Sequence, residues 1–206
     1  MIFIEQLHIK EAWRNLKVSN IPLDQITLLV GDQGCGKSTL LKEIQNQSMG
    51  VSPSVDFLDF KLSSIAQTVG ASCFYFDSES MNPRVAPIDD YYNPDYTAKG
   101  IGPGGALASR FMSHGEALKR FTVDMLVPKK LVNNSIILLD EPESGLSVKN
   151  QFLLSKRIQN ASKSKRAAVQ FIIATHCVPL IAKIGRVYDL ENGVWTKSIE
   201  YLNKFK

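Results

Sequence analysis

The stretch QITLLVGDQGCGKSTLLKEIQNQ, residues 25–47, decides the fold of this chain. Its first six residues form a short apolar run with several β-branched side chains, which predicts a buried strand over 25–30. A glycine-rich turn follows, and the pattern of residues 38–47 predicts a helix. A strand, a turn and a helix in this order are the context that a phosphate-binding loop requires.

The turn fits the pattern G-x-x-x-x-G-K-[S/T]. It consists of Gly31, Asp32, Gln33, Gly34, Cys35, Gly36, Lys37 and Ser38. Glycines allow consecutive N–H groups to point into one concavity at a helix N-terminus, where the helix dipole also favours an anion. We therefore expect Lys37 to reach the β- and γ-phosphates of ATP, Ser38 to join the magnesium shell and Thr39 to bond near the α-phosphate. The competing interpretation, a chance match in a glycine-rich turn, fits the flanking strand and helix poorly.

A second motif, IILLDEP at residues 136–142, places two carboxylates directly after an apolar run. The carboxyl ends of strands are where open α/β sheets bind ligands. We expect Asp140 to hold magnesium through water and Glu141 to polarise the water that attacks the γ-phosphate. The alternative is an acidic turn after a core strand, and the phosphate loop in the same chain favours the catalytic interpretation.

Two further candidates follow from local pattern. His176 comes after the apolar run FIIAT, and an imidazole at that strand end is suited to hydrogen-bond the γ-phosphate. Ser113 and Glu116 have the spacing of a capping box, and Ser113 with Gly115 leaves N–H groups at a helix start for an anion. For this second motif, chemistry alone favours plain helix capping.

Buried strands alternate with helices along the chain. We predict further strands over 2–9, 71–76, 135–139 and 169–174, and helices over 113–126 and 148–161. This alternation predicts an α/β P-loop NTPase fold, with a mainly parallel sheet flanked by helices and antiparallel strands at its edges. Alternating residues over 186–202 around Asn192-Gly193 predict a hairpin. Residues 82–105, rich in Pro, Gly, Asp and Tyr, predict a long loop or small insertion in a single domain over 1–206.

The composition is that of a globular protein, with 44% apolar and 21% charged residues. The net charge of +4 permits an acidic partner such as nucleic acid without requiring one. Three scattered cysteines form no zinc pattern and favour a reducing compartment. No apolar run approaches the ~20 residues that cross a bilayer, and the first residues have no signal-peptide pattern. We therefore expect a cytoplasmic protein without membrane insertion.

In this order, the motifs resemble those of ABC-type ATPases. The resemblance is to the soluble branch with structural-maintenance-of-chromosomes heads, RecF-like repair proteins and stand-alone ATPases of phage-defence type. IFIEQLHIKEAWRNLKVSNIPLDQITLLVGDQGCGKSTLLKEI is similar to the first strands and phosphate loop of that branch. IILLDEPESGL is similar to its Walker B motif and D-loop, IIATHCVPLI to its H-loop, and FMSHGEALKRF occupies the signature position.

This resemblance implies an ATPase that uses Mg²⁺ and forms a head-to-head homodimer around two ATP molecules. In such a dimer Ser113 and Gly115 would contact the γ-phosphate bound to the other subunit, and the D-loop residues 144–146 would cross the interface. Trp13 or Arg14 would lie near the adenine. The family also implies a protein partner, with the chain acting as a motor or switch in DNA repair, DNA processing or phage defence.

The chain departs from the family pattern at four places, two of which are Gln33, where asparagine is frequent in the phosphate loop, and Ser147, where transporters often carry the D-loop aspartate. Its signature reads S-H-G-E instead of L-S-G-G-Q, and Asp77 and Glu79 stand where the Q-loop glutamine is expected. The missing glutamine disfavours an alternative role as the nucleotide-binding subunit of a transporter, because transporters couple through that loop. A third hypothesis, a non-hydrolysing ATP sensor, is disfavoured by Glu141. The interval from Lys37 to Asp140 has no heptads, which disfavours a chromosome-bridging rod.

Overall fold

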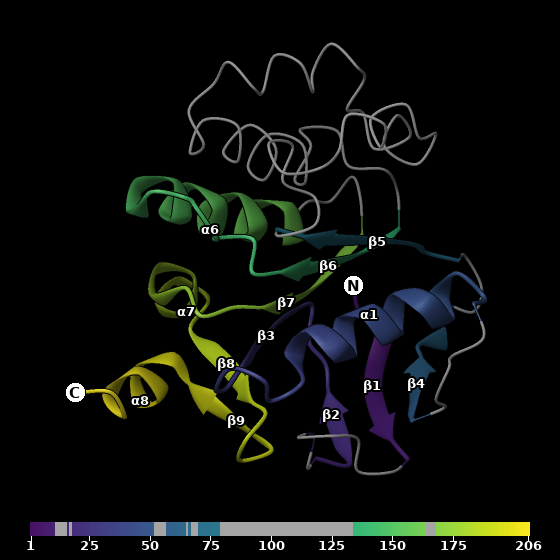
Figure 1. Cartoon of the computed structure of the whole chain (residues 1–206). Coiled ribbons are helices and arrows are strands. Elements are labelled where there is room, and N and C mark those ends of the chain that lie inside the picture. Colours follow the sequence, from purple (N-terminus) through teal and green to yellow (C-terminus); the bar gives the residue numbers. More distant parts are fainter. Residues whose placement is uncertain are drawn as a thin grey trace, which may run out of the picture.

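The computed structural model describes residues 1–10, 16, 18–51, 57–64, 66, 70–78, 134–163 and 168–206 (Figure 1). In this part of the chain the strands form a six-stranded sheet of order β5-β6-β7-β3-β8-β9 and a three-stranded sheet of order β2-β1-β4. The larger sheet contains β3 (Ile26–Val30), β5 (Ser72–Asp77), β6 (Ser135–Asp140), β7 (Val169–Ala174), β8 (Arg186–Asp189) and β9 (Val194–Lys197). The smaller sheet contains β1 (Ile4–Ile9), β2 (Asn20–Pro22) and β4 (Leu58–Leu62).

The larger sheet is parallel from β5 to β8, and β9 joins β8 as an antiparallel edge strand. This confirms the predicted sheet type. The register pairs Asp77 with Asp140, Asp140 with Ala174, and Ala174 with Leu29. The carboxyl ends of four neighbouring strands are therefore level, and the segments that follow them meet at one edge of the sheet.

Helices cover both faces of the larger sheet. The described helices are α1 (Lys37–Ser48), α6 (Val148–Ser162), α7 (Val178–Ile184) and α8 (Ser198–Asn203). Figure 1 shows α6 and α1 on opposite sides of β5, β6 and β7. Among these residues no helix combines the length and the apolar character needed to cross a membrane.

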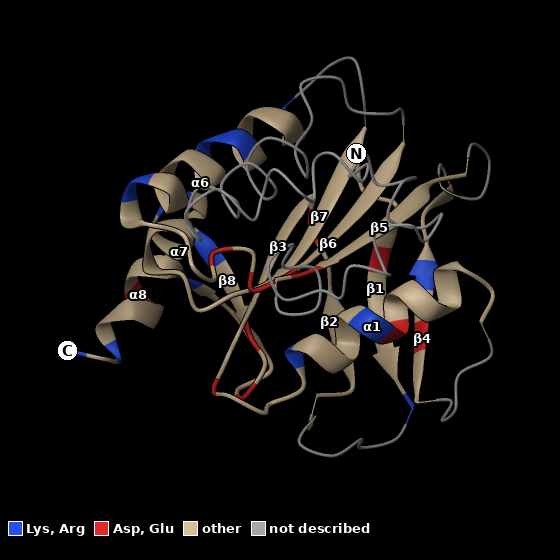
Figure 2. Ribbon diagram, turned by 45° about the horizontal axis from the view of Figure 1, so that its top comes forward, with Lys and Arg blue, Asp and Glu red and all other residues tan. Residues whose placement is uncertain are grey.

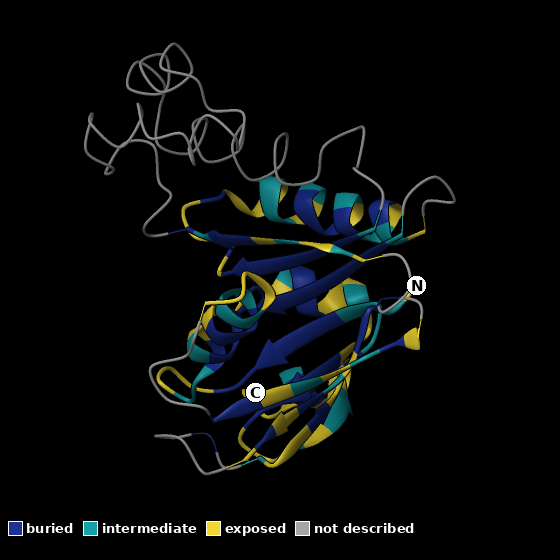
Figure 3. Ribbon diagram, turned by 90° about the vertical axis from the view of Figure 1, so that its right-hand side faces the viewer, coloured by how far each residue is buried: buried dark blue, intermediate teal, exposed yellow. Residues whose placement is uncertain are grey.

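Each central strand contributes side chains to two cores. Leu28 and Ile137 pack in the core beneath α6 and α7, whereas their neighbours Leu29 and Ile136 pack in the core that holds Leu40 of α1 and the smaller sheet. Figure 3 shows the central strands buried throughout. Burial on both faces explains why these strands have continuous apolar sequences instead of alternating ones.

The strand predicted over 2–9 is β1, and it lies in a separate antiparallel sheet with β2 and β4. One prediction about the larger sheet was wrong in detail. The alternating pattern predicted through residue 202 ends at Lys197, and α8 follows. Tyr201, which alternation would place on a strand, is instead buried against the core beneath α6 and α7. The predicted helix over 113–126 and the segment 82–105 lie outside the described residues.

Candidate nucleotide-binding and catalytic site

A cavity of about 510 Å³ opens at the carboxyl edge of the larger sheet. The phosphate loop, the start of α1, and the ends of β5, β6 and β7 surround it. Its lining residues are Leu16, Gln33, Gly34, Gly36, Lys37, Ser38, Thr39, Lys42, Asp77, Ser78, Asp140, Glu141, Ser144 and His176. Segments far apart in sequence therefore contribute polar groups to one space.

The phosphate loop turns into α1 at Gly36. This residue has φ 102° and precedes the first helical residue, Lys37. A Cβ atom built on Gly36 would lie 2.6 Å from Cγ of Leu16, so the left-handed backbone and the close packing both require glycine. The turn leaves the start of α1 facing the cavity, and helix N-termini favour phosphate groups.

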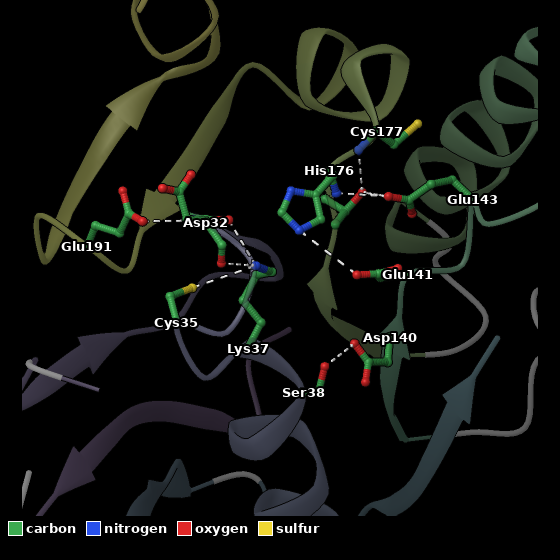
Figure 4. A network of polar contacts seen from close by, with 12 residues as sticks. Asp32, Cys35, Lys37, Ser38, Asp140, Glu141, Glu143, His176, Cys177 and Glu191 are labelled. Carbon is green, nitrogen blue, oxygen red and sulfur yellow. Dashed lines mark hydrogen bonds and ion pairs between the residues drawn. The ribbon is translucent and has the colours of Figure 1, made fainter. Parts of the chain in front are cut away.

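The Lys37 side chain is 5% exposed and lies along the loop. Its Nζ donates hydrogen bonds of 2.9 Å to the backbone oxygens of Gly31 and Asp32 (Figure 4). Its Nζ is also 3.6 Å from Sγ of Cys35. The ammonium group is thus held beside the backbone that would surround a phosphate.

The loop residues predicted to bind nucleotide divide into two groups. Those that line the cavity are Gln33, Gly34, Gly36, Lys37, Ser38 and Thr39. The others, Gly31, Asp32 and Cys35, contact Nζ of Lys37. Asp32 is held in turn by Glu191, whose Oε1 accepts a 2.9 Å hydrogen bond from the Asp32 backbone N–H (Figure 4).

Ser38 and Asp140 form a pair of oxygen donors at the cavity. The Ser38 hydroxyl donates a 2.9 Å hydrogen bond to Oδ1 of Asp140, and the Tyr75 hydroxyl donates a 3.1 Å bond to Oδ2. Burial raises the pKa of Asp140, and the hydrogen bonds from Ser38 and Tyr75 oppose this rise. Sequence reasoning did not identify Tyr75, because a tyrosine inside a strand looks like any other core aromatic.

This donor set fits magnesium bound together with a phosphate. Hydroxyl and carboxylate oxygens are ligands that Mg²⁺ prefers, and the ion commonly takes few protein ligands and completes its shell with water and phosphate. The described residues contain no group of three His, Cys, Asp or Glu side chains that could hold a metal alone. Ser38 and Asp140 therefore suit a metal that arrives with a nucleotide.

Glu141 and His176 lie beside each other in the lining of the cavity. Nε2 of His176 lies 3.9 Å from Oε1 of Glu141, and the two side chains are 44% and 48% exposed (Figure 4). Glu141 has φ 46°, an unusual backbone conformation for this residue, and its N–H donates to the Ala174 carbonyl at 2.9 Å. Burial, followed by the charge of Lys37, lowers the pKa of His176, which favours the neutral form of the imidazole.

The remaining predicted residues have different outcomes. Asp77 lines the cavity, with its Oδ2 3.9 Å from Nζ of Lys42. Glu79 lies outside the described residues, as do the predicted adenine contacts Trp13 and Arg14 and the signature residues Ser113 and Gly115. Their roles stay predictions.

A phosphate loop between a buried parallel strand and a helix, with two carboxylates after the neighbouring strand, defines a P-loop ATPase domain. The family model described as "ATPase family associated with various cellular activities (AAA)" matches residues 27–186. This is more than half of the chain, so the chain belongs to that family. No match is found among curated proteins.

Solved structures of ABC ATPases share the fold. The chain is similar to cbiO1 from Clostridium perfringens, part of the ABC transporter complex cbiONQ, with TM-score 0.52, 18% identity and coverage of 99% of this chain and 92% of that one. An ATP-binding subunit of an ABC transporter gives TM-score 0.56, 15% identity and coverage of 99% and 93%. UvrA2 from Deinococcus radiodurans gives TM-score 0.57 and 12% identity, covering 97% of this chain and 38% of UvrA2. The chain thus shares the fold of these solved structures.

Proposed function

We propose that this chain binds ATP with Mg²⁺ and hydrolyses it to ADP and phosphate. The observation that supports this most directly is the position of Glu141. Its carboxylate lies beside His176 and lines the same cavity as Lys37 and Ser38. Binding of nucleotide alone would need the phosphate loop but no carboxylate at that place.

Different residues of the chain bind the phosphates, hold the metal and activate the water. Backbone N–H groups of the loop and Nζ of Lys37 bind the β- and γ-phosphates. Ser38 and Asp140 would hold Mg²⁺, which neutralises charge on the phosphate oxygens when bound. Glu141 orients the attacking water and accepts its proton. The neutral His176 imidazole donates a hydrogen bond to the γ-phosphate oxygens.

Phosphate release from ATP tests this proposal. Wild-type protein with ATP and Mg²⁺ is expected to release phosphate, and Glu141→Gln to bind ATP with little release. Glu200→Gln is a matched control, because Glu200 is exposed on α8 and does not line the cavity. Equal turnover in wild type and Glu141→Gln would remove Glu141 from the mechanism. Binding without release by wild type, with candidate partners present, would favour an ATP sensor.

We further propose a single ABC-type domain over 1–206, with a loop or insertion at 82–105, that forms a head-to-head homodimer around ATP. Ser113 and Gly115 would act on the other subunit's nucleotide, and Trp13 or Arg14 would lie near the adenine. The exposed Ser144 lines the cavity, as the D-loop role requires. Ser113→Arg is expected to block ATP-driven dimerisation while leaving ATP binding intact. Dimerisation of this variant would contradict the signature assignment.

The proposed cellular role is a switch or motor for a partner protein in DNA repair, DNA processing or phage defence. Helix α6 carries Lys149, Lys156 and Arg157 and no acidic residue, so it is suited to face an acidic partner such as nucleic acid (Figure 2). DNA affinity that falls with salt would support this role, because phosphate contacts release counterions. Co-purification with a membrane protein would favour the transporter subunit instead.

A further inference from the structure

A third carboxylate in the segment 140–143, that of Glu143, lies behind the site without lining its cavity. Glu143 is 9% exposed and comes two residues after Glu141. Its Oε1 accepts a 2.6 Å hydrogen bond from the Thr175 hydroxyl and a 2.8 Å bond from the backbone N–H of His176 (Figure 4). A buried carboxylate oxygen therefore holds the backbone of the residue whose imidazole faces Glu141.

This contact is part of a wider connection between two segments. The Thr175 hydroxyl also accepts a 2.9 Å bond from the N–H of Cys177. Gln151 of α6 donates from Nε2 to the Leu146 carbonyl at 3.1 Å, and its Oε1 is 3.6 Å from Sγ of Cys177. The turn after β6 and the segment after β7 are thus joined at two separate points.

The cost of burying Glu143 indicates that its position matters. Oε2 of Glu143 is buried and has no hydrogen-bond partner within the described part of the chain. An unsatisfied buried carboxylate oxygen is unfavourable for stability. Two short hydrogen bonds to the one oxygen, Oε1, fix the Thr175–His176 backbone closely.

We propose that Glu143 is a positioning residue for ATP hydrolysis. It sets the His176 imidazole relative to Glu141 by holding the His176 backbone, and it connects this histidine to the D-loop turn at residues 144–146. The inference rests on the proposed function.

The test combines substitutions at Glu143 and His176. Glu143→Ala is expected to lower kcat about tenfold, while ATP affinity stays near wild type. A tenfold effect is typical of the interaction between side chains that share one hydrogen-bond network. In a His176→Ala background the same change is expected to have no further effect on kcat. Glu143→Gln keeps an oxygen acceptor and is expected to restore most of the lost activity. An equal loss in both backgrounds would overturn the proposal.

A control separates positioning from general destabilisation. Gln170, at the opposite end of β7, is fully buried and bonds the backbone of Phe3, Ile4 and Asp24. Gln170→Ala is expected to lower stability and leave kcat per folded molecule unchanged. A kcat loss in Gln170→Ala equal to that in Glu143→Ala would show that lost buried hydrogen bonds are enough, and would overturn the proposal.

A second readout does not require turnover. The backbone N–H of His176 donates to Glu143, so its amide proton is expected to exchange faster and shift upfield in Glu143→Ala but not in Gln170→Ala. Selective ¹⁵N-histidine labelling, assigned with His176→Asn, isolates this signal. If wild type binds ATP and releases no phosphate, the proposed function fails, and an unchanged His176 amide in Glu143→Ala would overturn the positioning role separately.

Discussion

The Ser38 hydroxyl donates a 2.9 Å hydrogen bond to Oδ1 of Asp140, which joins the first turn of α1 to the end of β6 across 102 positions of sequence. The parallel register makes this contact, because it places the ends of β3 and β6 on either side of β7 at one sheet edge. Two oxygens in this arrangement can share one magnesium ion. The other oxygen of Asp140 is held by Tyr75, and this contact leads to the first prediction.

Tyr75→Phe is expected to weaken magnesium-dependent ATP binding. The change removes only the hydroxyl that bonds Oδ2 of Asp140 at 3.1 Å. Residues that orient metal ligands typically change metal affinity by about 10–100-fold, and we expect the lower end here because Ser38 still contacts Asp140. Magnesium titration of ATP binding measures the effect. Tyr201→Phe provides a matched control on α8, and an unchanged magnesium midpoint in Tyr75→Phe would contradict the orienting role of Tyr75.

Lys37→Ala is expected to reduce ATP affinity by about 100-fold. A buried ammonium group that contacts phosphate contributes charge-assisted hydrogen bonds, each of about 1.5–3 kcal/mol. Lys37 is 5% exposed and lies within the loop, so no other part of the loop can replace its charge. Calorimetric titration with ATP measures the affinity. Lys149→Ala, on the exposed start of α6, controls for net charge, and tight binding by Lys37→Ala would exclude the phosphate-loop assignment.

Glu141→Gln is expected to bind ATP, lose about 10²–10⁴-fold in kcat and accumulate as a dimer. The amide keeps the shape of the side chain but cannot accept the proton from water, and the range is that of general base catalysis. The positive φ of Glu141 is tolerated equally by both side chains, so the fold should be preserved. Light scattering with and without ATP and Mg²⁺ measures the mass. A monomer with normal turnover would contradict both the catalytic and the dimer proposals.

The sequence predicted the central part of the site because that part is local. The phosphate loop and the pair Asp140-Glu141 each lie in one short motif next to an apolar strand, and the structure brings both to the same edge. Tyr75, Glu143 and Glu191 act through partners that are distant in sequence, such as Asp140, His176 and Asp32. Their roles depend on the register of the strands, which periodicity does not specify. One indication of Glu143 was present in the sequence, because the motif DEPE at residues 140–143 contains a third carboxylate.

The limits of the fold prediction have a similar cause. The apolar residues of β1 predicted a strand correctly but not its sheet, because β2 and β4 pair with it through contacts distant in sequence. The start of α8 was missed because residues 198–202 alternate as a strand would, while burial of Tyr201 against the core favours the helix. Tertiary packing decided both cases against local pattern.

Lys204→Met is expected to lower the free energy of unfolding by about 1–2 kcal/mol at pH 7. Lys204 Nζ lies 2.7 Å from Oδ2 of Asp189, and the Asp189 side chain is only 2% exposed. Asp189 is close in sequence to Glu191, which bonds the phosphate loop at Asp32. Breaking a fully buried pair costs about 3–5 kcal/mol, and we expect less because the Lys204 side chain is 45% exposed. Lys197→Met, which removes an exposed pair with Glu200, is expected to change stability by less than about 0.5 kcal/mol.

The effect of Lys204→Met should depend on pH in a definite direction. Burial alone would raise the pKa of Asp189, but Lys204 and Asn192 outweigh it and hold the pKa below 3.8. A carboxyl group whose pKa is lower in the folded than in the unfolded state stabilises the fold fully when the pH is above its pKa in the unfolded state. This contribution is lost as the pH falls through its pKa in the folded state. The difference between wild type and Lys204→Met is therefore expected to be full at pH 7 and smaller at pH 3. Urea unfolding at both pH values measures it, and a difference that is equal at both would show that Lys204 acts through packing on Tyr201 instead.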